Sequence, residues 1–355
     1  MIFLLPAALA DTCESYGKEE TLSPLTDTSV DEASGLVELR TRPDVWVTHN
    51  DAGGAPALYV FNLKGELLRT LSVLGASHDD WEDITAGPCP LTDKRCLFIG
   101  DIGDNSTDRE HIIVYAVPEP TEDDISLSIE ATWEVSYPGE PANSEALVYH
   151  PCTDQLQLIT KVSNAPAEIW AFPTTPGKGE LSQVAELDLY AYTLGNYLVT
   201  GADWDDTGER LVLRTYASIL EWHTDPAAPA AHWSAPPDVQ FESRSGQLES
   251  IAYDHDGNLV SITEGELTRM FRWSCEGRVK GAACPGADPK DTGDSGTSTD
   301  TAEPTDTAEP TDTAEPIDTA EPTDTNAPDD ATCGCGTGTA ALLLPVGLLF
   351  WRRRR

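Results

Sequence analysis

The sequence predicts an all-β protein, a single β-propeller built from four-stranded blades, and three observations support this. Short runs rich in Val, Ile, Leu, Thr, Tyr and Trp, bounded by Gly, Pro, Asn and Asp, fill residues 11 to 284. Long stretches with helical periodicity are absent from that range. One short phrase, a Glu followed by small and apolar residues, recurs along the chain.

The recurring phrase marks the repeats. Its copies are Glu32-Ala33-Ser34-Gly35-Leu36, Trp81-Glu82-Asp83-Ile84, Glu145-Ala146-Leu147-Val148, Glu249-Ser250-Ile251-Ala252 and a degenerate Thr200-Gly201-Ala202-Asp203. The phrases begin at positions 32, 82, 145, 200 and 249, so the steps are 50, 63, 55 and 49 residues. A repeat of this length with four strands is typical of a propeller blade. We count five blades; the 63-residue step leaves six open. A β-sandwich is the alternative architecture, but it does not explain the recurring phrase.

Each phrase is expected to form the innermost strand of its blade, with the Glu near the central channel. In the first repeat, residues 46–49, 57–61 and 67–71 follow as the three outer strands. The last repeat lacks an obvious fourth strand, and residues 18–22 could supply it. Closing the ring in this way would remove exposed sheet edges.

The two ends of the chain differ from the propeller segment, residues 11–285. Residues 1–10 are apolar and end in Ala8-Leu9-Ala10, which predicts a signal peptide, although it is short and lacks a charged n-region, as a truncated one would. Residues 286–332 are acidic and contain four copies of D-T-A-E-P-T between Asp300 and Thr323, with Ile317 the one variant. This composition cannot build a core, so we expect a disordered, extended stalk.

Residues 333–355 combine a Cys-Gly-Cys-Gly motif, an apolar run expected to form a short helix, and a terminal Arg cluster. This order resembles the MYXO-CTERM sorting signal, which implies export, recognition at the Cys motif and attachment to the cell surface. The residues concerned are Cys333, Cys335, Arg352, Arg353, Arg354 and Arg355. A plain C-terminal membrane anchor is the alternative and predicts the same topology.

Charge and cysteine content restrict the function further. The net charge of −39 and the pI of about 4.2 exclude nucleic acid as the partner. They suit divalent cations, cationic partners or plain solubility. We expect a monomer with an unidentified extracellular ligand, in contact with a membrane only through the C-terminal segment.

Six cysteines precede residue 285, and an even set in an exported chain predicts disulfides. They are Cys13, Cys89, Cys96, Cys152, Cys275 and Cys284. Cys89 and Cys96 could join the ends of the loop between them. Cys275 and Cys284 could do the same, which would leave Cys13 for Cys152, but the sequence leaves this pairing open.

Several motifs resemble those of a family of secreted bacterial β-propellers with little functional characterisation. They are His49-Asn50-Asp51, Asp80-Trp81-Glu82-Asp83-Ile84, Gly100-Asp101-Ile102-Gly103-Asp104-Asn105 with Arg109, Val199-Thr200-Gly201-Ala202-Asp203 with Leu213-Arg214-Thr215-Tyr216, and Leu248-Glu249-Ser250-Ile251-Ala252. The resemblance covers nearly all of residues 30–275. It implies a propeller and export, but no established reaction.

The repeated Glu residues predict a cation site on the propeller axis. Four carboxylates that converge cannot all stay ionised without a counter-charge, and Ca²⁺ accepts oxygen ligands in irregular geometry. The candidate ligands are Glu32, Glu82, Glu145 and Glu249, with Asp51, Asp83, Asp101, Asp104 and Asn105 on nearby loops. The alternative is that these Glu side chains cap backbone amides or pair with Arg109, Arg214 and Arg244.

The sequence therefore predicts an exported, surface-anchored binding module that depends on Ca²⁺. The alternative is a metal-dependent hydrolase resembling the propeller phosphatases and phytases, although few Lys or Arg residues accompany the acidic loops to hold a phosphate. A structural surface-layer component is a third class, in which the channel acids would have no task. No G-x-S-x-G or HExxH motif is present.

Overall fold

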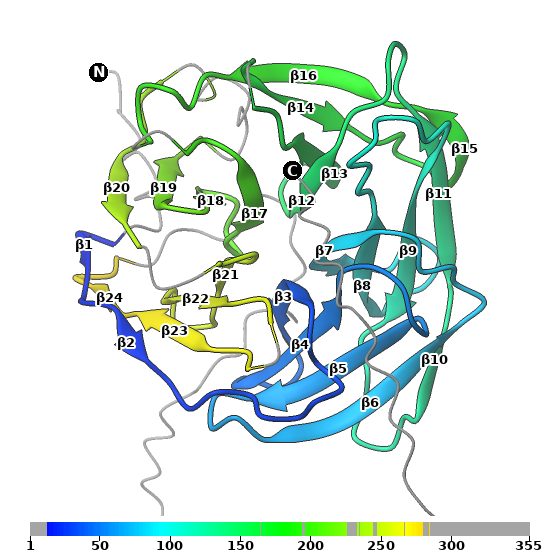
Figure 1. The fold of residues 1–355 in the computed structure, drawn as a ribbon, viewed down its shortest axis with the longest axis horizontal. Helices are drawn as coiled ribbons and strands as arrows, with labels where there is room; N and C mark the ends of the chain where they lie inside the picture. The colour runs from blue at the N-terminus through cyan, green and yellow to red at the C-terminus, as the bar shows by residue number, and fades with distance from the viewer. Residues whose placement is uncertain are drawn as a thin grey trace, which may run out of the picture. The chain divides into compact units, whose positions relative to one another are not determined.

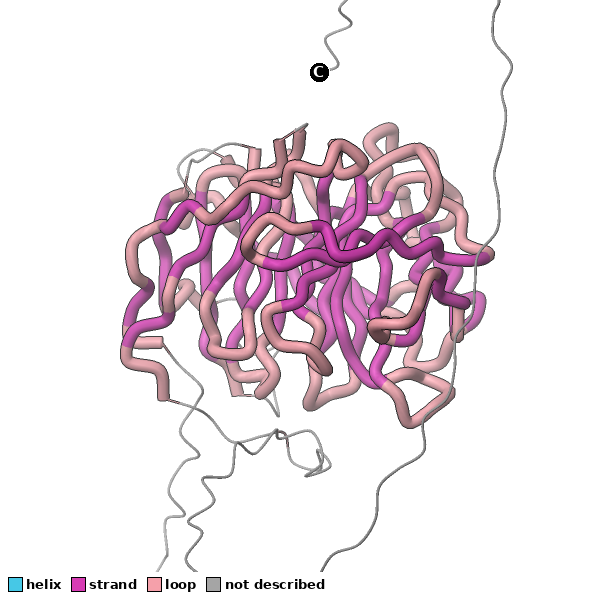
Figure 2. Tube along the Cα trace, turned by 90° about the horizontal axis from the view of Figure 1, so that it is seen from below, coloured by secondary structure: helices cyan, strands magenta, loops and turns pink. Residues whose placement is uncertain are grey.

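The computed structural model describes residues 13–163, 165–193, 196–225, 233, 235–243, 247–265, 267–279 and 284. Within these ranges the secondary structure consists of strands, and no helix that could cross a bilayer is present. Five sheets stand around a common axis (Figure 1), and their strands run between two faces that carry the loops (Figure 2). The prediction of a five-bladed propeller is confirmed, and the alternative of six blades is wrong.

Each blade is an antiparallel sheet of four strands, which follow one another from the innermost strand outward. Blade 1 is β3 (Ala33–Glu38), β4 (Val45–Asn50), β5 (Ala57–Asn62) and β6 (Leu67–Leu74); blade 2 is β7 (Trp81–Pro88), β8 (Arg95–Asp101), β9 (Ile112–Pro118) and β11 (Ala131–Ser136); blade 3 is β12 (Ser144–His150), β13 (Gln155–Thr160), β14 (Ala167–Ala171) and β16 (Ser182–Leu187); blade 4 is β17 (Val199–Trp204), β18 (Arg210–Thr215), β19 (Ser218–His223) and β20 (Val239–Glu242); blade 5 is β21 (Ala252–Tyr253), β22 (Leu259–Ile262), β23 (Met270–Trp273) and β2 (Glu20–Thr21).

The ring closes with a strand from the start of the chain. Strand β2 pairs with β23 through Glu20 and Arg272 and through Thr21 and Phe271. This confirms that residues 18–22 supply the missing fourth strand. Next to it, β1 (Ser15–Tyr16) pairs with β24 (Cys275–Glu276), so both ends of the propeller segment meet in the same place.

The 63-residue step between the second and third phrases comes from an insertion. Part of it forms β10 (Ser126–Ser128), which pairs in parallel with β6 at the outer edge of blade 1. In the same way β15 (Gly177–Glu180) adds a parallel strand to β11 of blade 2. The additional residues therefore cover the edges of neighbouring blades.

Three disulfides connect the six cysteines. The predicted pair Cys89–Cys96 is present, but the other suggested pairs are wrong, because Cys13 joins Cys275 and Cys152 joins Cys284. The pairing of β1 with β24 brings the Cα atoms of Cys13 and Cys275 to 5.4 Å, within the range that a disulfide spans. The sequence could not give this pairing, because it depends on how the ring closes.

Apolar clusters fill the spaces between neighbouring blades and hold the innermost strands in place. The bulkiest completely enclosed side chains include Trp46, Trp81, Trp222 and Trp273, each at most 2% exposed. Tryptophan side chains therefore contribute much of the packing between blades. The signal peptide, the stalk and the C-terminal segment that the sequence predicts lie outside the described residues.

Candidate functional site

In four blades the innermost strand carries a β-bulge at its start, and in blade 5 the register shifts by one residue between Leu248 and Ala252, just before β21. The bulged residue lies at the mouth of the channel. In blade 2 Trp81 pairs with Asp101 and Asp83 with Gly100, so Glu82 has no partner across the ladder. The equivalent bulged residues in the other blades are Ser34, Glu145, Thr200 and Glu249. A bulge redirects a side chain at the end of a strand, which explains why these positions converge.

In blade 1 the register differs from the one that the phrase suggests. The regular pair Leu36–Thr48 corresponds to Ile84–Ile99 in blade 2, so Ser34 occupies the position of Glu82. Glu32 lies two residues earlier and is exposed, which separates it from the buried bulge positions.

At two of the five bulges a hydroxyl replaces the carboxylate. The Ser34 hydroxyl donates to the backbone oxygen of Glu82 at 2.6 Å, and the Thr200 hydroxyl donates to that of Leu248 at 3.1 Å. These hydroxyls join neighbouring blades. The axial carboxylates at the bulges are therefore those of Glu82, Glu145 and Glu249.

Three carboxylates from two blades form what we call the axial acid triad: Asp51, Asp80 and Glu82. One oxygen from each lies within 4.8 Å of the others. Asp51 follows β4, whereas Asp80 and Glu82 lie at the start of β7. The backbone fixes this arrangement, because the amide of Trp81 donates to the carbonyl of Asp51 at 2.8 Å.

Glu82 is the unusual member of the triad. Its side chain is only 4% exposed, and burial and the charges of Glu145, Asp51 and Asp80 all act against its ionised form, while Lys161 acts in the opposite direction. Glu82 Oε1 and Asp80 Oδ2 both face the Cα of Gly103, where a Cβ atom would collide with them. In addition, Asp51 Oδ1 is buried without a hydrogen-bond partner. Unpaired buried carboxylates are costly, so a counter-charge would stabilise this arrangement.

Burial and mutual repulsion keep the pKa values of these carboxyls high. Burial, together with the charge of Asp80 and hydrogen bonding between the two carboxyls, raises the pKa of Asp51 to about 8. Burial and then the charges of Glu145 and Asp51 raise the pKa of Glu82 well above its usual range. Burial is also the main cause of the raised pKa of Asp80. The triad resists ionisation without a cation.

A second group lies beside the triad, between blades 3 and 4. The ammonium of Lys161 donates to Glu145 and, at 2.7 Å, to the hydroxyl of Tyr216. Asn143 Nδ2 lies 3.4 Å from the other oxygen of Glu145. Burial raises the pKa of Glu145 to about 7, although Lys161 acts in the opposite direction.

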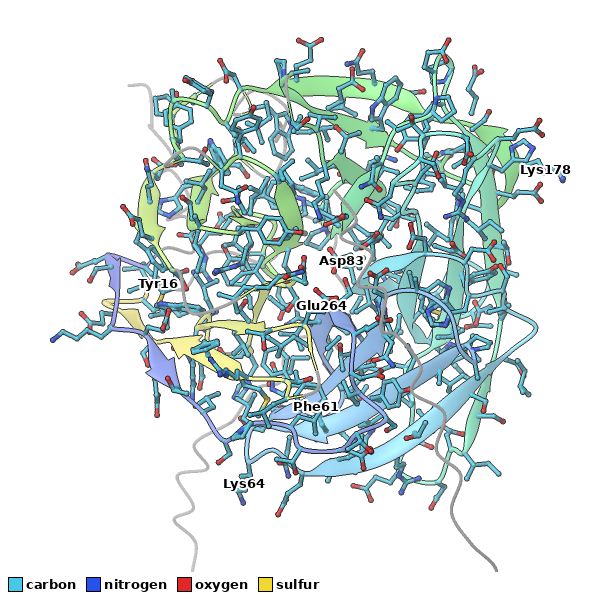
Figure 3. All side chains as sticks on the ribbon, viewed as in Figure 1. Tyr16, Phe61, Lys64, Asp83, Lys178 and Glu264 are labelled. Atoms are coloured by element: carbon cyan, nitrogen blue, oxygen red, sulfur yellow. A yellow bond between two sulfur atoms is a disulfide. The ribbon has the colours of Figure 1, made fainter. Side chains whose placement is uncertain are left out.

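Blade 5 supplies the third group. The side-chain amide of Gln247 donates to Glu249 at 2.8 Å and also to Glu264. Burial, followed by the charges of Glu249 and Glu32, raises the pKa of Glu264. Glu264 lies near the centre of the ring in the view along the axis (Figure 3).

Electrostatic coupling joins the three groups. The charge of Glu264 contributes to the raised pKa of Asp51, that of Glu249 to the raised pKa of Glu145, and that of Glu145 to the raised pKa of Glu82. We call this set the axial mouth: Asp51, Asp80, Glu82, Glu145, Lys161, Tyr216, Gln247, Glu249 and Glu264.

Two other predicted ligands hold the loops that carry the triad. Asp101 is fully buried, accepts a hydrogen bond from the amide of Asp80 at 3.1 Å and pairs with Arg109 at 2.8 Å. Asp104 accepts hydrogen bonds from the amides of Asp108 and Arg109 at 3.1 and 3.0 Å. Asp101 and Asp104 therefore bind loop amides and Arg109, the role that the sequence alternative assigned to the Glu side chains.

Asp83 and Asn105 also lie apart from the triad. Asp83 is buried and accepts hydrogen bonds from the amides of Ile84 and Leu147, both at 2.9 Å, so it links two innermost strands. Asn105 is exposed and accepts a hydrogen bond from Asn143 at 3.3 Å.

The sequence interpretation omitted several residues of the mouth. Asp80 was visible as part of the motif that precedes β7, but it was not assigned a role. Lys161 and Glu264 each follow the second strand of a blade, the strand that ends at the same face where the innermost strand begins. A search for charged residues at that position in every repeat would have found both.

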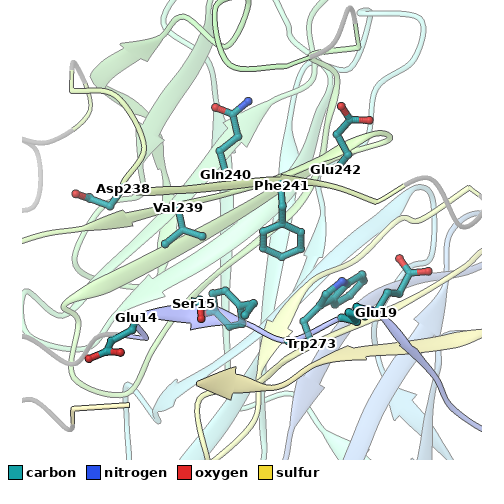
Figure 4. A pocket seen from close by; sticks show the side chains of 12 residues that line it. Glu14, Ser15, Glu19, Asp238, Val239, Gln240, Phe241, Glu242 and Trp273 are labelled. Atoms are coloured by element: carbon teal, nitrogen blue, oxygen red, sulfur yellow. The ribbon is translucent and has the colours of Figure 1, made fainter. Parts of the chain in front are cut away.

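A second concave feature lies at the rim of the ring, away from the residues of the mouth. This groove, of about 490 Å³, is lined by β1, β20 and Trp273 (Figure 4). Tyr16 and Phe241 form part of its wall, with ring centroids 5.8 Å apart. None of the predicted ligands lines it.

Comparisons with known proteins identify no family. No family model matches the chain, and no curated protein matches it. Among solved structures, a gluconolactonase from Xanthomonas campestris is 12% identical, with 76% of this chain and 99% of that chain covered and a TM-score of 0.43. The β-propeller domain of Cps50 (Swd1) from Myceliophteria thermophila is 10% identical, with 72% and 99% covered and a TM-score of 0.39.

Proposed function

We propose that the protein is an exported, surface-displayed binding module that holds Ca²⁺ at the axial acid triad and binds its ligand there. The observation that carries this proposal is the axial acid triad itself, in which Glu82 is 4% exposed and Asp51 Oδ1 is buried without a hydrogen-bond partner. A cation would provide the counter-charge that this group lacks.

The donor set fits Ca²⁺. This ion takes six to eight oxygen ligands at about 2.3–2.6 Å, so oxygens on its opposite sides are about 5 Å apart. The triad presents one carboxylate oxygen from each residue within 4.8 Å. Water and further oxygens would complete the shell, and carboxylates without nitrogen or sulfur ligands favour a hard cation.

The disulfides support the proposed export of the protein, because such bonds persist in oxidising compartments. Three of them tie the propeller segment together. The resemblance of residues 333–355 to a sorting signal supports anchoring at the cell surface.

The geometry supports a binding module better than a phosphate-ester hydrolase. Such a hydrolase needs cations that are free to hold the phosphate oxygens. At the mouth Lys161 is engaged by Glu145 and Tyr216, and Arg109 by Asp101.

A calorimetric titration of the full chain with Ca²⁺, before and after treatment with EDTA, tests the proposal. We expect binding and a higher melting temperature with Ca²⁺, because ligands of the native state stabilise it. Glu82→Gln should weaken Ca²⁺ binding about 100-fold or more, since a charged ligand is lost. Without Ca²⁺ the same variant should melt no lower than the wild type, because the raised pKa keeps the Glu82 carboxyl neutral there and Gln is neutral too.

The control is Glu186→Gln, which changes an exposed residue of the outer strand β16 and should leave Ca²⁺ binding unchanged. Gly103→Ala should weaken binding, since its Cβ displaces the carboxylates of Glu82 and Asp80. The proposal fails if the wild type binds no Ca²⁺, or if Glu82→Gln binds it equally well. A phosphate-ester activity screen with and without Ca²⁺ tests the hydrolase alternative.

A further inference from the structure

The charge of the axial mouth restricts the ligands that it can accept. Six carboxyls act on one another there: those of Asp51, Asp80, Glu82, Glu145, Glu249 and Glu264. One divalent ion and Lys161 together offset three carboxylate charges. The mouth therefore holds more carboxyls than positive groups after a divalent ion binds. A phosphate, sulfate or carboxylate ligand would meet repulsion from the remaining carboxylates.

The hydrogen-bonding groups of the mouth also favour a ligand that is uncharged. Ionised carboxylates only accept hydrogen bonds, so a ligand has to bring donors. Lys161 and Gln247 are already engaged, since Lys161 donates to Glu145 and Tyr216, while Gln247 donates to Glu249 and Glu264. The hydroxyl of Tyr216 accepts from Lys161 and keeps one O–H to donate, so carboxylate acceptors still outnumber donors. A molecule with several hydroxyl groups meets both needs, because its oxygens can coordinate a cation and its O–H groups can donate to carboxylates.

The far side of the mouth is suited to receive such donors. Glu249 is 8% exposed, and Glu264 is half-buried on the opposite side of Gln247. Each carboxylate has one oxygen bonded to Gln247 and a second oxygen available to accept a hydrogen bond. These oxygens are close enough to the triad to interact with it electrostatically, because the charge of Glu264 contributes to the raised pKa of Asp51.

We propose that the ligand of the axial mouth is a neutral saccharide, whose adjacent hydroxyls coordinate the cation at Asp51, Asp80 and Glu82 while another hydroxyl donates to Glu264. This inference rests on the proposed function, because it needs the cation site. It adds that the ligand is uncharged, and it identifies Glu264 as a residue that determines specificity without holding the cation.

An array of neutral glycans, printed beside sialylated, sulfated and phosphorylated ones, tests the ligand class with the full chain. In 1 mM Ca²⁺ we expect binding to neutral glycans, and EDTA should abolish it. Glu264→Ala should reduce glycan binding about tenfold or more, the cost of one hydrogen bond to a charged group. It should change the Ca²⁺ affinity less than about threefold, since Glu264 acts on the triad only through a partly screened charge. Glu264→Gln should restore part of the glycan binding, and Glu186→Ala on β16 should leave it unchanged.

Three outcomes would overturn the inference. They are a preference for anionic glycans, displacement of neutral glycans by micromolar spermidine, or no glycan binding while the Ca²⁺ titration succeeds. Failure of the Ca²⁺ titration itself would refute the proposed function instead, so the two results can be told apart.

Discussion

At the scale of single residues, the five bulge positions show how one backbone feature serves two purposes. Where the bulge carries Ser34 or Thr200, the side chain bonds the backbone of the next blade and the ring is held together. Where it carries Glu82, Glu145 or Glu249, the same backbone position presents a carboxylate to the channel. The fold therefore does not require the carboxylates. Glu145 bonds Lys161 and Glu249 bonds Gln247, so the proposed cation is needed chiefly to account for Glu82.

The raised pKa values in the triad predict that Ca²⁺ binding releases protons. The pKa of Asp51 is raised to about 8, so without Ca²⁺ this carboxyl is largely protonated at pH 7. Since Ca²⁺ must displace the proton, its affinity should rise about tenfold or more from pH 6 to pH 8 and level off above. Titrations in buffers of different ionisation enthalpy would count the protons released.

Stability should show the opposite trend without Ca²⁺. A carboxyl whose pKa is higher in the folded protein than in the unfolded chain binds more protons in the native state. The free energy of unfolding should therefore fall as the pH rises from about 4 to 8. A Ca²⁺ affinity that does not change between pH 6 and pH 8 would contradict the assignment of Asp51 as a Ca²⁺ ligand that is protonated in the free protein.

At the scale of elements, the sequence predicted the strands better than their registers. The innermost strands follow the recurring phrases, because alternation and turn residues are local properties. The bulge in β3 is not visible in the sequence, since Glu32 precedes small and apolar residues as Glu82 and Glu145 do. Only the pairing of Leu36 with Thr48 shows that Ser34 occupies the axial position. The disulfide pairing likewise depends on which strands meet when the ring closes.

The Cys13–Cys275 disulfide should contribute more to stability than Cys89–Cys96. It joins residues 262 positions apart and fixes β1 beside β24, where the ring closes. Cys89–Cys96 closes a separation of only 7 residues. In the chain-entropy description longer loops gain more. Replacing Cys13 and Cys275 by Ser should therefore lower the free energy of unfolding by about 4–5 kcal/mol.

The matched control is the double replacement of Cys89 and Cys96 by Ser, which should cost about 2 kcal/mol. Both variants would be compared with the wild type by denaturant unfolding under non-reducing conditions. An equal or larger loss for the Cys89–Cys96 variant would show that ring closure does not depend on the Cys13–Cys275 bond.

At the scale of the whole molecule, the repeat made the architecture predictable, but the site depended on the ring. Five similar segments imply a propeller because each blade must bury its faces against neighbours. The mouth, in contrast, combines residues from positions as far apart as Asp51 and Glu264. Asp80 and Glu82 could be suspected from their motif. That Asp101 and Asp104 hold loops, whereas Asp80 joins the triad, follows only from the hydrogen bonds that the loops make.

The separation between the propeller and the rest of the chain leads to a prediction about localisation. All three disulfides and the whole axial mouth lie before residue 285, so removing residues 333–355 should leave folding and Ca²⁺ binding intact. If these residues direct anchoring, the truncated protein should appear in the medium of the cells that make it, whereas the full chain should stay with the cells. Deleting only the repeats between Asp300 and Thr323 is the matched control, because it shortens the segment predicted to be a stalk and keeps the Cys motif, the apolar run and the Arg cluster. That variant should remain cell-bound.

The outcome is measured by fractionation of the cells and detection of the propeller. Retention of the truncated chain on cells would mean that the propeller itself binds the surface. Addition of EDTA would then test whether the axial mouth makes that contact.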